Sequence, residues 1–303
     1  MKKNNKTDYA LLHWKTLAWL TVRDTLSWLF VALTLIASLI AFLPDEEALW
    51  LRQIIPFCAY HVWVPAVALV LIAGVALLFN WPRTKAVYKD KNTDISIIIE
   101  CCDVLQQKGL KVIHTVDTFD TELDRIISPR TLHGAFLQLC RQQHINLDEQ
   151  IDAALEHRVP RSVNENLPGR KKQYGLGSVC GVKVGDEPYA CVAFTRLQPN
   201  GTIEITKEEY IRCLKQMWRN LSDPHYKHDE VNVAVMGNKF VDLPAEFSTE
   251  QKIDLMIQTF FVAAREKACC RTLRICVHPN NVTDIDFDTY PTIIAHLAKR
   301  PVI

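Results

Sequence analysis

Two stretches of the sequence lack charged side chains altogether. Residues 26–43 contain no Asp, Glu, Lys or Arg, and residues 62–81 contain none either. A helix needs roughly 20 apolar residues to cross the core of a bilayer, and both stretches approach that length. We therefore predict two transmembrane helices, at about 26–43 and 62–81, within a membrane anchor formed by residues 1–82. A pair of buried core helices is the alternative interpretation.

The sequence also lacks a large excess of charge and lacks paired cysteine motifs. Its formal net charge is +1, so there is no basic excess to release counterions from phosphates, which argues against a nucleic-acid partner. None of the 10 cysteines belongs to a Cys-x-x-Cys motif. Free buried cysteine behaves as a small hydrophobic residue and is typical of reducing compartments. We therefore expect structural thiols.

Basic residues are distributed unevenly around the two apolar stretches. The connecting loop is acidic, with Asp45, Glu46 and Glu47 against Arg52. The outer flanks are basic, with Lys2, Lys3, Lys6, Lys15 and Arg23 before the first stretch and Arg83, Lys85, Lys89 and Lys91 after the second. Because Lys and Arg in short flanks stay on the cytoplasmic side, we predict that both termini are cytoplasmic.

Sequence signatures of common catalytic sites are missing. There is no G-x-S-x-G elbow, no H-E-x-x-H zinc motif and no Walker A lysine. Asp284, Asp286 and Asp288 alternate, but their surroundings favour a loop or short strand over a calcium site. We therefore predict no catalytic residue, no metal site and no enzymatic activity.

The rest of the chain has the pattern of an α/β domain. Residues 83–93 are polar and are predicted to form a linker, and residues 94–303 the domain. Apolar runs predict strands at 95–100, 110–116, 178–185, 189–197, 231–236 and 273–278, and helical spacing predicts helices at 131–143, 147–156, 207–221 and about 248–266. Alternating strands and helices indicate a sheet covered on both faces.

Candidate binding residues follow the predicted strands. Ligands of open α/β folds bind beyond the carboxyl ends of the strands, which directs attention to Asp103, to Asp117–Asp120 and to Gly237–Phe240. His133-Gly134 and the turn Gly175–Ser178 are added because glycine permits close approach of the backbone to a phosphate, and consecutive amides can form an anion nest.

Taken in order, these segments resemble a divergent macro domain attached to two transmembrane helices, as in the effector of type II Thoeris antiphage defence. The similarity rests on ECCDVL, VIHTVDTFDTEL, ISPRTLHGAF, YGLGSV, VNVAVMGNKF and LRICVHP. It implies a three-layer α/β/α domain with a mixed sheet. It also implies that the domain binds a derivative of ADP-ribose.

The resemblance assigns roles to particular residues. Asp103 is similar to the aspartate that binds adenine, and Thr115–Thr118 replaces the asparagine-rich turn near the distal ribose. The segment Gly237–Phe240 replaces the glycine-rich diphosphate loop. The departure from the hydrolase-type asparagine suggests a reader of ADP-ribose and not a hydrolase. The implied ligand-binding set is Asp103, Asp117, His133, Gly134, Gly175, Gly177, Ser178, Gly237, Asn238, Lys239 and Phe240.

The resemblance further implies a sensor that acts at a membrane. A TIR-domain partner would make the signal, an imidazole- or histidine-linked ADP-ribose, and no other cofactor is expected. Binding would drive homo-oligomerisation and disruption of the bacterial inner membrane, which aborts infection. Two alternatives stay open: a membrane-tethered ADP-ribosyl hydrolase with Asp117 or Asp120 as base, and an anchored scaffold without a nucleotide ligand.

Overall fold

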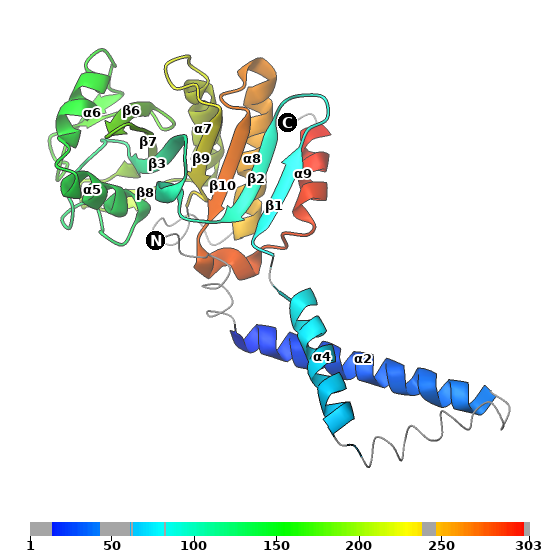
Figure 1. The fold of residues 1–303 in the computed structure, drawn as a ribbon. Coiled ribbons are helices and arrows are strands. Elements are labelled where there is room, and N and C mark those ends of the chain that lie inside the picture. The colour runs from blue at the N-terminus through cyan, green and yellow to red at the C-terminus, as the bar shows by residue number, and fades with distance from the viewer. Residues whose placement is uncertain (1–13, 43–60, 62, 82, 238–246, 300–303) are drawn as a thin grey trace. The chain divides into compact units, whose positions relative to one another are not determined.

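The computed structural model describes residues 14–42, 61, 63–81, 83–237 and 247–299. It divides the chain into two compact units, Met1–Arg83 and Thr84–Ile303. Figure 1 shows the two units, the first with helices α2 and α4 and the second with the sheet and helices α5 to α9. Each unit is described separately below.

Two helices make up the described part of the N-terminal unit, α2 (Trp14–Phe42) and α4 (Trp63–Phe79). The ring of Trp28 meets that of Phe79 edge to face, with centroids 5.8 Å apart. Asn80 Nδ2, just beyond α4, donates to Asp24 Oδ2 at 2.8 Å. Hydroxyl groups within α2 donate to the carbonyl four residues earlier, at Thr21, Thr25, Ser27, Thr34 and Ser38. Their polar atoms are thereby satisfied inside the helix.

The lengths and sequences of these helices differ from the prediction. Among the described residues, no helix is both long enough and apolar enough to cross a membrane, so the spans predicted at about 26–43 and 62–81 are not found there. Helix α4 has 17 residues, fewer than the roughly 20 that a bilayer core requires. Helix α2 has 29 residues but begins at Trp14 and so includes Arg23 and Asp24.

Eight strands of the described chain form one mixed sheet, in the order β1-β2-β10-β9-β3-β7-β6 with β8 paired to β7. Strands β2, β10, β9, β3 and β7 are parallel, whereas β1, β6 and β8 run antiparallel to their neighbours. Their bounds are β1 (Lys85–Lys89), β2 (Ser96–Cys101), β3 (Leu110–Val116), β6 (Val179–Val184), β7 (Glu187–Leu197), β8 (Ile203–Glu204), β9 (Glu230–Ala234) and β10 (Thr272–Val277). The predicted α/β domain with a mixed sheet is confirmed.

Helices cover the two faces of this sheet (Figure 1). On one face lie α5 (Leu132–Gln142) and α6 (Leu147–Leu155), whose apolar side chains join those of β3, β6 and β7 in one core cluster. On the other face Phe194 of β7 meets Tyr210 of α7 (Lys207–Leu221) with ring centroids 5.7 Å apart. Helix α7 packs on α8 (Thr249–Lys267), and α9 (Tyr290–Lys299) packs on α8 and β1.

Local sequence explains why these helices form where they do. Thr206 and Glu209 make a capping box at the start of α7, and Ser248 and Gln251 make another at the start of α8. The apolar positions of α7 recur at helical spacing, and all of its buried side chains face the core: Tyr210, Cys213, Leu214, Met217, Trp218 and Leu221. The helices predicted from this spacing are therefore found.

Three segments depart from the sequence-based expectation. Residues 83–93, predicted to be a linker, contain strand β1, which pairs along its whole length with β2. Residues 157–174, which lie outside the predicted strands and helices, carry a small hairpin of β4 (Ser162–Val163) and β5 (Lys172–Gln173). The segment with alternating aspartates includes the 3₁₀ helix η2 (Pro279–Asp284).

Candidate functional site

The carboxyl ends of the central parallel strands form one edge of the sheet, and the candidate site lies there. Because β2, β10, β9 and β3 are parallel neighbours, the segments that follow them lie at the same edge. The first residue of α5 also reaches this edge, since Leu132 packs against Cys102, Val104 and Cys276. The edge therefore combines four strand ends with a helix N-terminus.

Asp103 begins a 3₁₀ turn, η1 (Val104–Gln106), directly beyond β2. Its Oδ1 accepts a hydrogen bond from Leu105 N at 3.0 Å, and its Oδ2 accepts one from Gln106 Nε2 at 3.0 Å. The side chain is nevertheless exposed. The turn thus holds an accessible carboxylate in a fixed orientation, with lone pairs still available to a ligand.

The N-terminus of α5 is shaped by Thr131 and Gly134. Thr131 Oγ1 accepts from Gly134 N at 2.9 Å and donates to Ser128 O at 2.8 Å. A Cβ atom at Gly134 would overlap Ser128 O and lie 2.7 Å from Pro129 Cα. Glycine at this position therefore allows the segment 128–131 to lie against the first turn. The amide groups of such a helix start favour anions.

Two neutral histidines lie close together near this edge, and sequence reasoning found only one of them. His133, in the first turn of α5, is 6% exposed, and burial lowers the pKa of its ring to about 3, with His114 adding to the effect. Burial also lowers the pKa of His114 on β3 to about 4. Sequence reasoning missed His114 because it lies within a predicted apolar strand. A polar residue inside that apolar run was the available signal.

Two buried polar atoms near the end of β3 lack a hydrogen-bond partner. His114 Nδ1 and Thr118 Oγ1 are shielded from solvent, and neither has a hydrogen-bond partner among the described residues. Buried polar atoms without a partner are costly in a folded chain. A polar ligand could supply the missing partners of such atoms.

Asp117 is directed into the protein. It is 3% exposed, its Oδ1 accepts from Leu197 N at 3.0 Å and its Oδ2 accepts from Gln173 Nε2 at 3.0 Å. Burial raises the pKa of this carboxyl to about 6, although both hydrogen bonds oppose the shift. Asp117 thus joins the end of β7 to the hairpin strand β5 and is not presented to the site.

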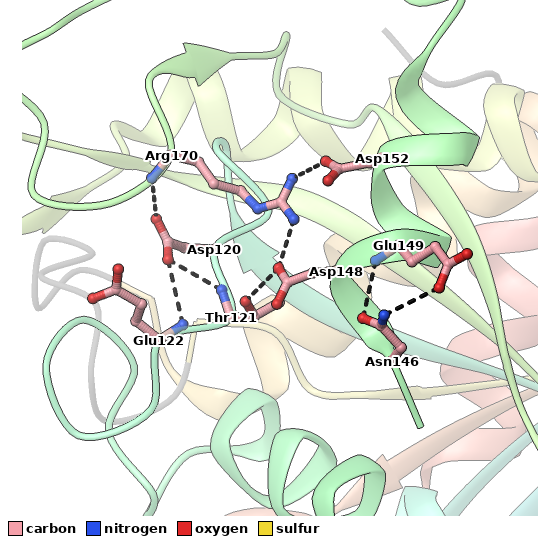
Figure 2. A network of polar contacts seen from close by, with 8 residues as sticks. All are labelled: Asp120, Thr121, Glu122, Asn146, Asp148, Glu149, Asp152 and Arg170. Atoms are coloured by element: carbon pink, nitrogen blue, oxygen red, sulfur yellow. Dashed lines mark hydrogen bonds and ion pairs between the residues drawn. The ribbon is translucent and has the colours of Figure 1, made fainter. Parts of the chain in front are cut away.

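Asp120 anchors the segment 157–174 in a similar way (Figure 2). One carboxylate oxygen accepts from Thr121 N and Glu122 N, and the other accepts from Arg170 N at 2.8 Å. The guanidinium of Arg170 pairs with Asp148 and Asp152 of α6. Asp120 therefore serves the packing of this segment, and main-chain amides already occupy its carboxylate.

The predicted glycine turn at 175–178 packs on α7. Gly177 has a φ of +86°, and a Cβ there would lie 2.8 Å from Cys213 O. Asn220 Nδ2 of α7 donates to Gly177 O at 2.7 Å, and Ser178 N donates to Gly175 O at 3.0 Å. The contacts of Gly177 and Ser178 are thus with the protein, and a Cβ at nearby Gly175 would meet only Ser178 Oγ, at 3.8 Å.

Gly237 follows β9 at the candidate edge and has a φ of +81°. Its carbonyl accepts from Lys252 Nζ at 3.0 Å, and the preceding carbonyl, of Met236, accepts from Tyr210 Oη at 3.4 Å. Helices α8 and α7 thus hold the start of this loop. Asn238, Lys239 and Phe240 lie outside the described residues.

The structure therefore separates the predicted site residues into two groups. Asp103, His133, Gly134 and Gly237 belong to segments at the carboxyl edge of the parallel strands, and His114 and Thr118 lie near and just beyond the end of β3. Asp117, Gly177 and Ser178 are engaged in packing. Within the described ranges, no cluster of three or more His, Cys, Asp or Glu side chains could hold a metal ion.

An α/β domain whose mixed sheet presents a strand-end aspartate and a helix N-terminus at one edge defines a macro-like domain. The sequence family described as Thoeris protein ThsA, Macro domain, matches residues 97–278. This match covers more than half of the 303 residues, and the chain belongs to that family.

Two solved structures are also similar to this chain, at low identity. Two mutants of the Oceanobacillus iheyensis macrodomain match: one is 9% identical over 71% of this chain and 96% of that chain, with a TM-score of 0.43. The other is 10% identical over 70% of this chain and 97% of that chain, with a TM-score of 0.42. No curated protein matches the sequence.

Proposed function

We propose that this protein is an antiphage defence effector whose C-terminal domain binds an ADP-ribose-derived signal at the carboxyl edge of the sheet. Asp103 is the observation that carries the proposal. Its carboxylate is exposed, oriented by Leu105 N and Gln106 Nε2, and located where the family resemblance expects the adenine contact. Carboxylate oxygens accept hydrogen bonds from an exocyclic amino group such as that of adenine.

The rest of the edge suits a diphosphate and a ribose. The N-terminus of α5 offers amide donors and a favourable dipole for phosphate. His114 Nδ1 and Thr118 Oγ1 lack partners in the described chain, and a ligand hydroxyl or phosphate would supply them. His114 and His133 stay neutral at physiological pH, so they contribute hydrogen bonds and not charge.

The proposed signal is an imidazole- or histidine-linked ADP-ribose made by a TIR-domain partner, and the proposal includes no other cofactor. The protein acts as a reader and not as an enzyme. Two carboxylates that could serve a hydrolase, Asp117 and Asp120, are already engaged by main-chain amides. Their engagement supports a binding role.

The N-terminal unit supports a role at the bacterial inner membrane. Large apolar side chains stand exposed along both helices, among them Phe30, Leu33, Val70, Leu78 and Phe79. Exposed apolar surface of this extent is characteristic of contact with a membrane or another chain. In the proposal, ligand binding favours homo-oligomers of the effector, and the clustered helices disrupt the membrane and abort infection.

Calorimetric titration of the full-length protein in detergent tests the binding step. ADP-ribose and its imidazole and histidine conjugates are the ligands, with Asp103→Ala as the variant. A lost hydrogen bond to a charged group costs about 1.5–3 kcal/mol, so we expect the dissociation constant to rise about 10- to 100-fold. Asp186→Ala is the matched control, because Asp186 is an exposed aspartate directly before the amino end of β7.

The outcomes separate the competing functions. Conjugate-selective binding that Asp103→Ala weakens supports the sensor. Release of free ADP-ribose from an ADP-ribosylated substrate would instead identify a hydrolase. Absence of binding to all three ligands would leave an anchored scaffold and overturn the proposal.

The membrane step has its own test. The protein should sediment with inner membranes and resist extraction at alkaline pH, and a dye excluded by intact membranes should enter cells after the TIR partner is activated. Asp103→Ala should prevent dye entry without changing sedimentation. Recovery of the wild-type protein in the soluble fraction would refute the membrane role.

A further inference from the structure

Two cysteines lie against each other beneath the candidate site. Strand β2 ends at Cys101, which pairs in register with Val277 of β10. The next residue, Cys102, turns toward the neighbouring strand, and its Sγ lies 3.0 Å from Cys276 Sγ. Val104, Leu105, Leu132 and Ala234 surround the pair, so the two sulfurs belong to the apolar layer under the Asp103 turn.

This proximity distinguishes the pair from the other described cysteines. All nine described cysteines are buried, and none of them forms a disulfide. Cys269 and Cys270, which are adjacent in sequence, have sulfurs 3.8 Å apart. A disulfide requires about 2.05 Å between its sulfurs, so Cys102 and Cys276 need to approach by only about 1 Å, whereas Cys269 and Cys270 need nearly twice that.

We propose that Cys102 and Cys276 form a reversible disulfide when the protein meets a peroxide. Cys102 thiolate attacks one peroxide oxygen, which breaks the O–O bond and gives a sulfenic acid and water. Cys276 sulfur then displaces the hydroxyl group of the sulfenic acid as a second water molecule. Two thiols and one hydrogen peroxide thus give one disulfide and two waters, and an external dithiol reverses the step.

The surroundings assign the order of attack. Cys102 lies in the turn after β2 and is 8% exposed, whereas Cys276 lies within β10 and is 2% exposed. The neighbouring Cys102 and burial hold the pKa of Cys276 well above its usual value. Cys102 is therefore the residue that meets the oxidant, and Cys276 is the resolving residue. In a reducing compartment such disulfides are transient and regulatory.

The position of the disulfide gives it a consequence at the site. Cys102 directly precedes Asp103, and Cys276 belongs to the adjacent strand, so the new bond ties the Asp103 turn to β10. The oxidised protein should hold the segment Asp103–Gln107 more rigidly than the reduced protein. Any effect on ligand affinity rests on the proposed function, but the bond itself and the change in rigidity do not.

Peptide mass spectrometry of the full-length protein tests the proposal directly. The protein is treated with hydrogen peroxide, remaining thiols are alkylated, and the peptides carrying residues 102 and 276 are identified before and after reduction with dithiothreitol. We expect a linked peptide that reduction releases. Hydrogen exchange at Asp103–Gln107 should be slower in the oxidised form by at least about threefold, because the added covalent constraint restricts local opening.

Variants identify the order of attack and guard against non-specific oxidation. Cys276→Ser should leave a sulfenic acid at Cys102 that a dimedone probe captures, and Cys102→Ser should prevent both products. Cys269→Ser is the matched control and should still form the bond between residues 102 and 276. Free thiols at both positions after treatment, with native hydrogen exchange elsewhere, would overturn the proposal, as would equal linkage of Cys269 to Cys270. Calorimetric titration of the reduced protein tests ligand binding independently.

Discussion

Gly134→Ala tests whether the start of α5 is held against the segment 128–131. The added methyl group would overlap Ser128 O and lie 2.7 Å from Pro129 Cα. Both neighbours are backbone atoms, so neither can move aside as a side chain could. Overpacking of this kind costs about 1–3 kcal/mol. Replacing glycine by alanine inside a helix recovers about 1 kcal/mol, and the clash should prevail.

Because the contacts are with backbone atoms and below 3.0 Å, we expect Gly134→Ala to lower the free energy of unfolding by about 1–2 kcal/mol. For a domain of this size, that corresponds to a fall in Tm of about 2–8 °C, which differential scanning calorimetry resolves. Gly175→Ala is the matched control in the same domain. Its nearest neighbour would be Ser178 Oγ at 3.8 Å, so its Tm should stay unchanged or rise slightly.

The ligand titration adds a second measurement to this pair of variants. Displacing the segment 128–131 would also move the amide groups at the start of α5, so Gly134→Ala should weaken ligand binding while Gly175→Ala should not. A Gly134→Ala protein as stable as the wild type would refute the argument, because it would mean that segment 128–131 shifts without cost.

Three further predictions concern residues outside the candidate site. Burial raises the pKa of Asp117 from 3.8 to about 6 in the folded chain. The protonated carboxyl therefore stabilises the folded state, and this contribution is complete below about pH 4 and is lost as the pH rises through about 6. The side chain of the Asp117→Asn variant cannot ionise, so its Tm should not show this fall between pH 4 and 7. The Tm of the control variant Asp186→Ala should still show it. Arg170→Met removes the pairs with Asp148 and Asp152; because these carboxylates are exposed, urea unfolding should show a loss of about 1 kcal/mol. Thr206→Ala removes the capping box of α7 and should cost about 1 kcal/mol in the same assay, whereas Thr206→Ser should be neutral.

Most of the sheet could be predicted because each central strand is rich in apolar residues. Strands β3, β7 and β9 are buried on both faces, and such strands are recognisable without any tertiary information. Strand β1 could not be predicted in this way. Its sequence, KAVYK, buries only Ala86 fully, and it forms because the backbone of β2 offers an unpaired edge.

The candidate site was only partly predictable for a related reason. Asp103 and Gly237 follow parallel strands, and the position of strand ends is a local property of the sequence. The role of Asp117 depends on Gln173 and Leu197, which lie 56 and 80 residues further along the chain. The positive φ of Gly177 similarly serves contact with α7. No local pattern reveals whether a polar residue faces a ligand or a distant amide.

The pairing of β1 with β2 links the site of the proposed sensor, through main-chain hydrogen bonds, to the start of the C-terminal unit. Cys101 N donates to Thr84 O at 2.8 Å, and Lys85 pairs in register with Glu100. The first residues of the C-terminal unit are thus hydrogen-bonded to the end of the strand that carries Asp103. Thr84 directly follows the N-terminal unit, which ends at Arg83. Strand β1 is the first strand of the domain after the apolar helices, and it pairs with β2. A ligand that orders the Asp103 turn therefore acts on this pair of strands.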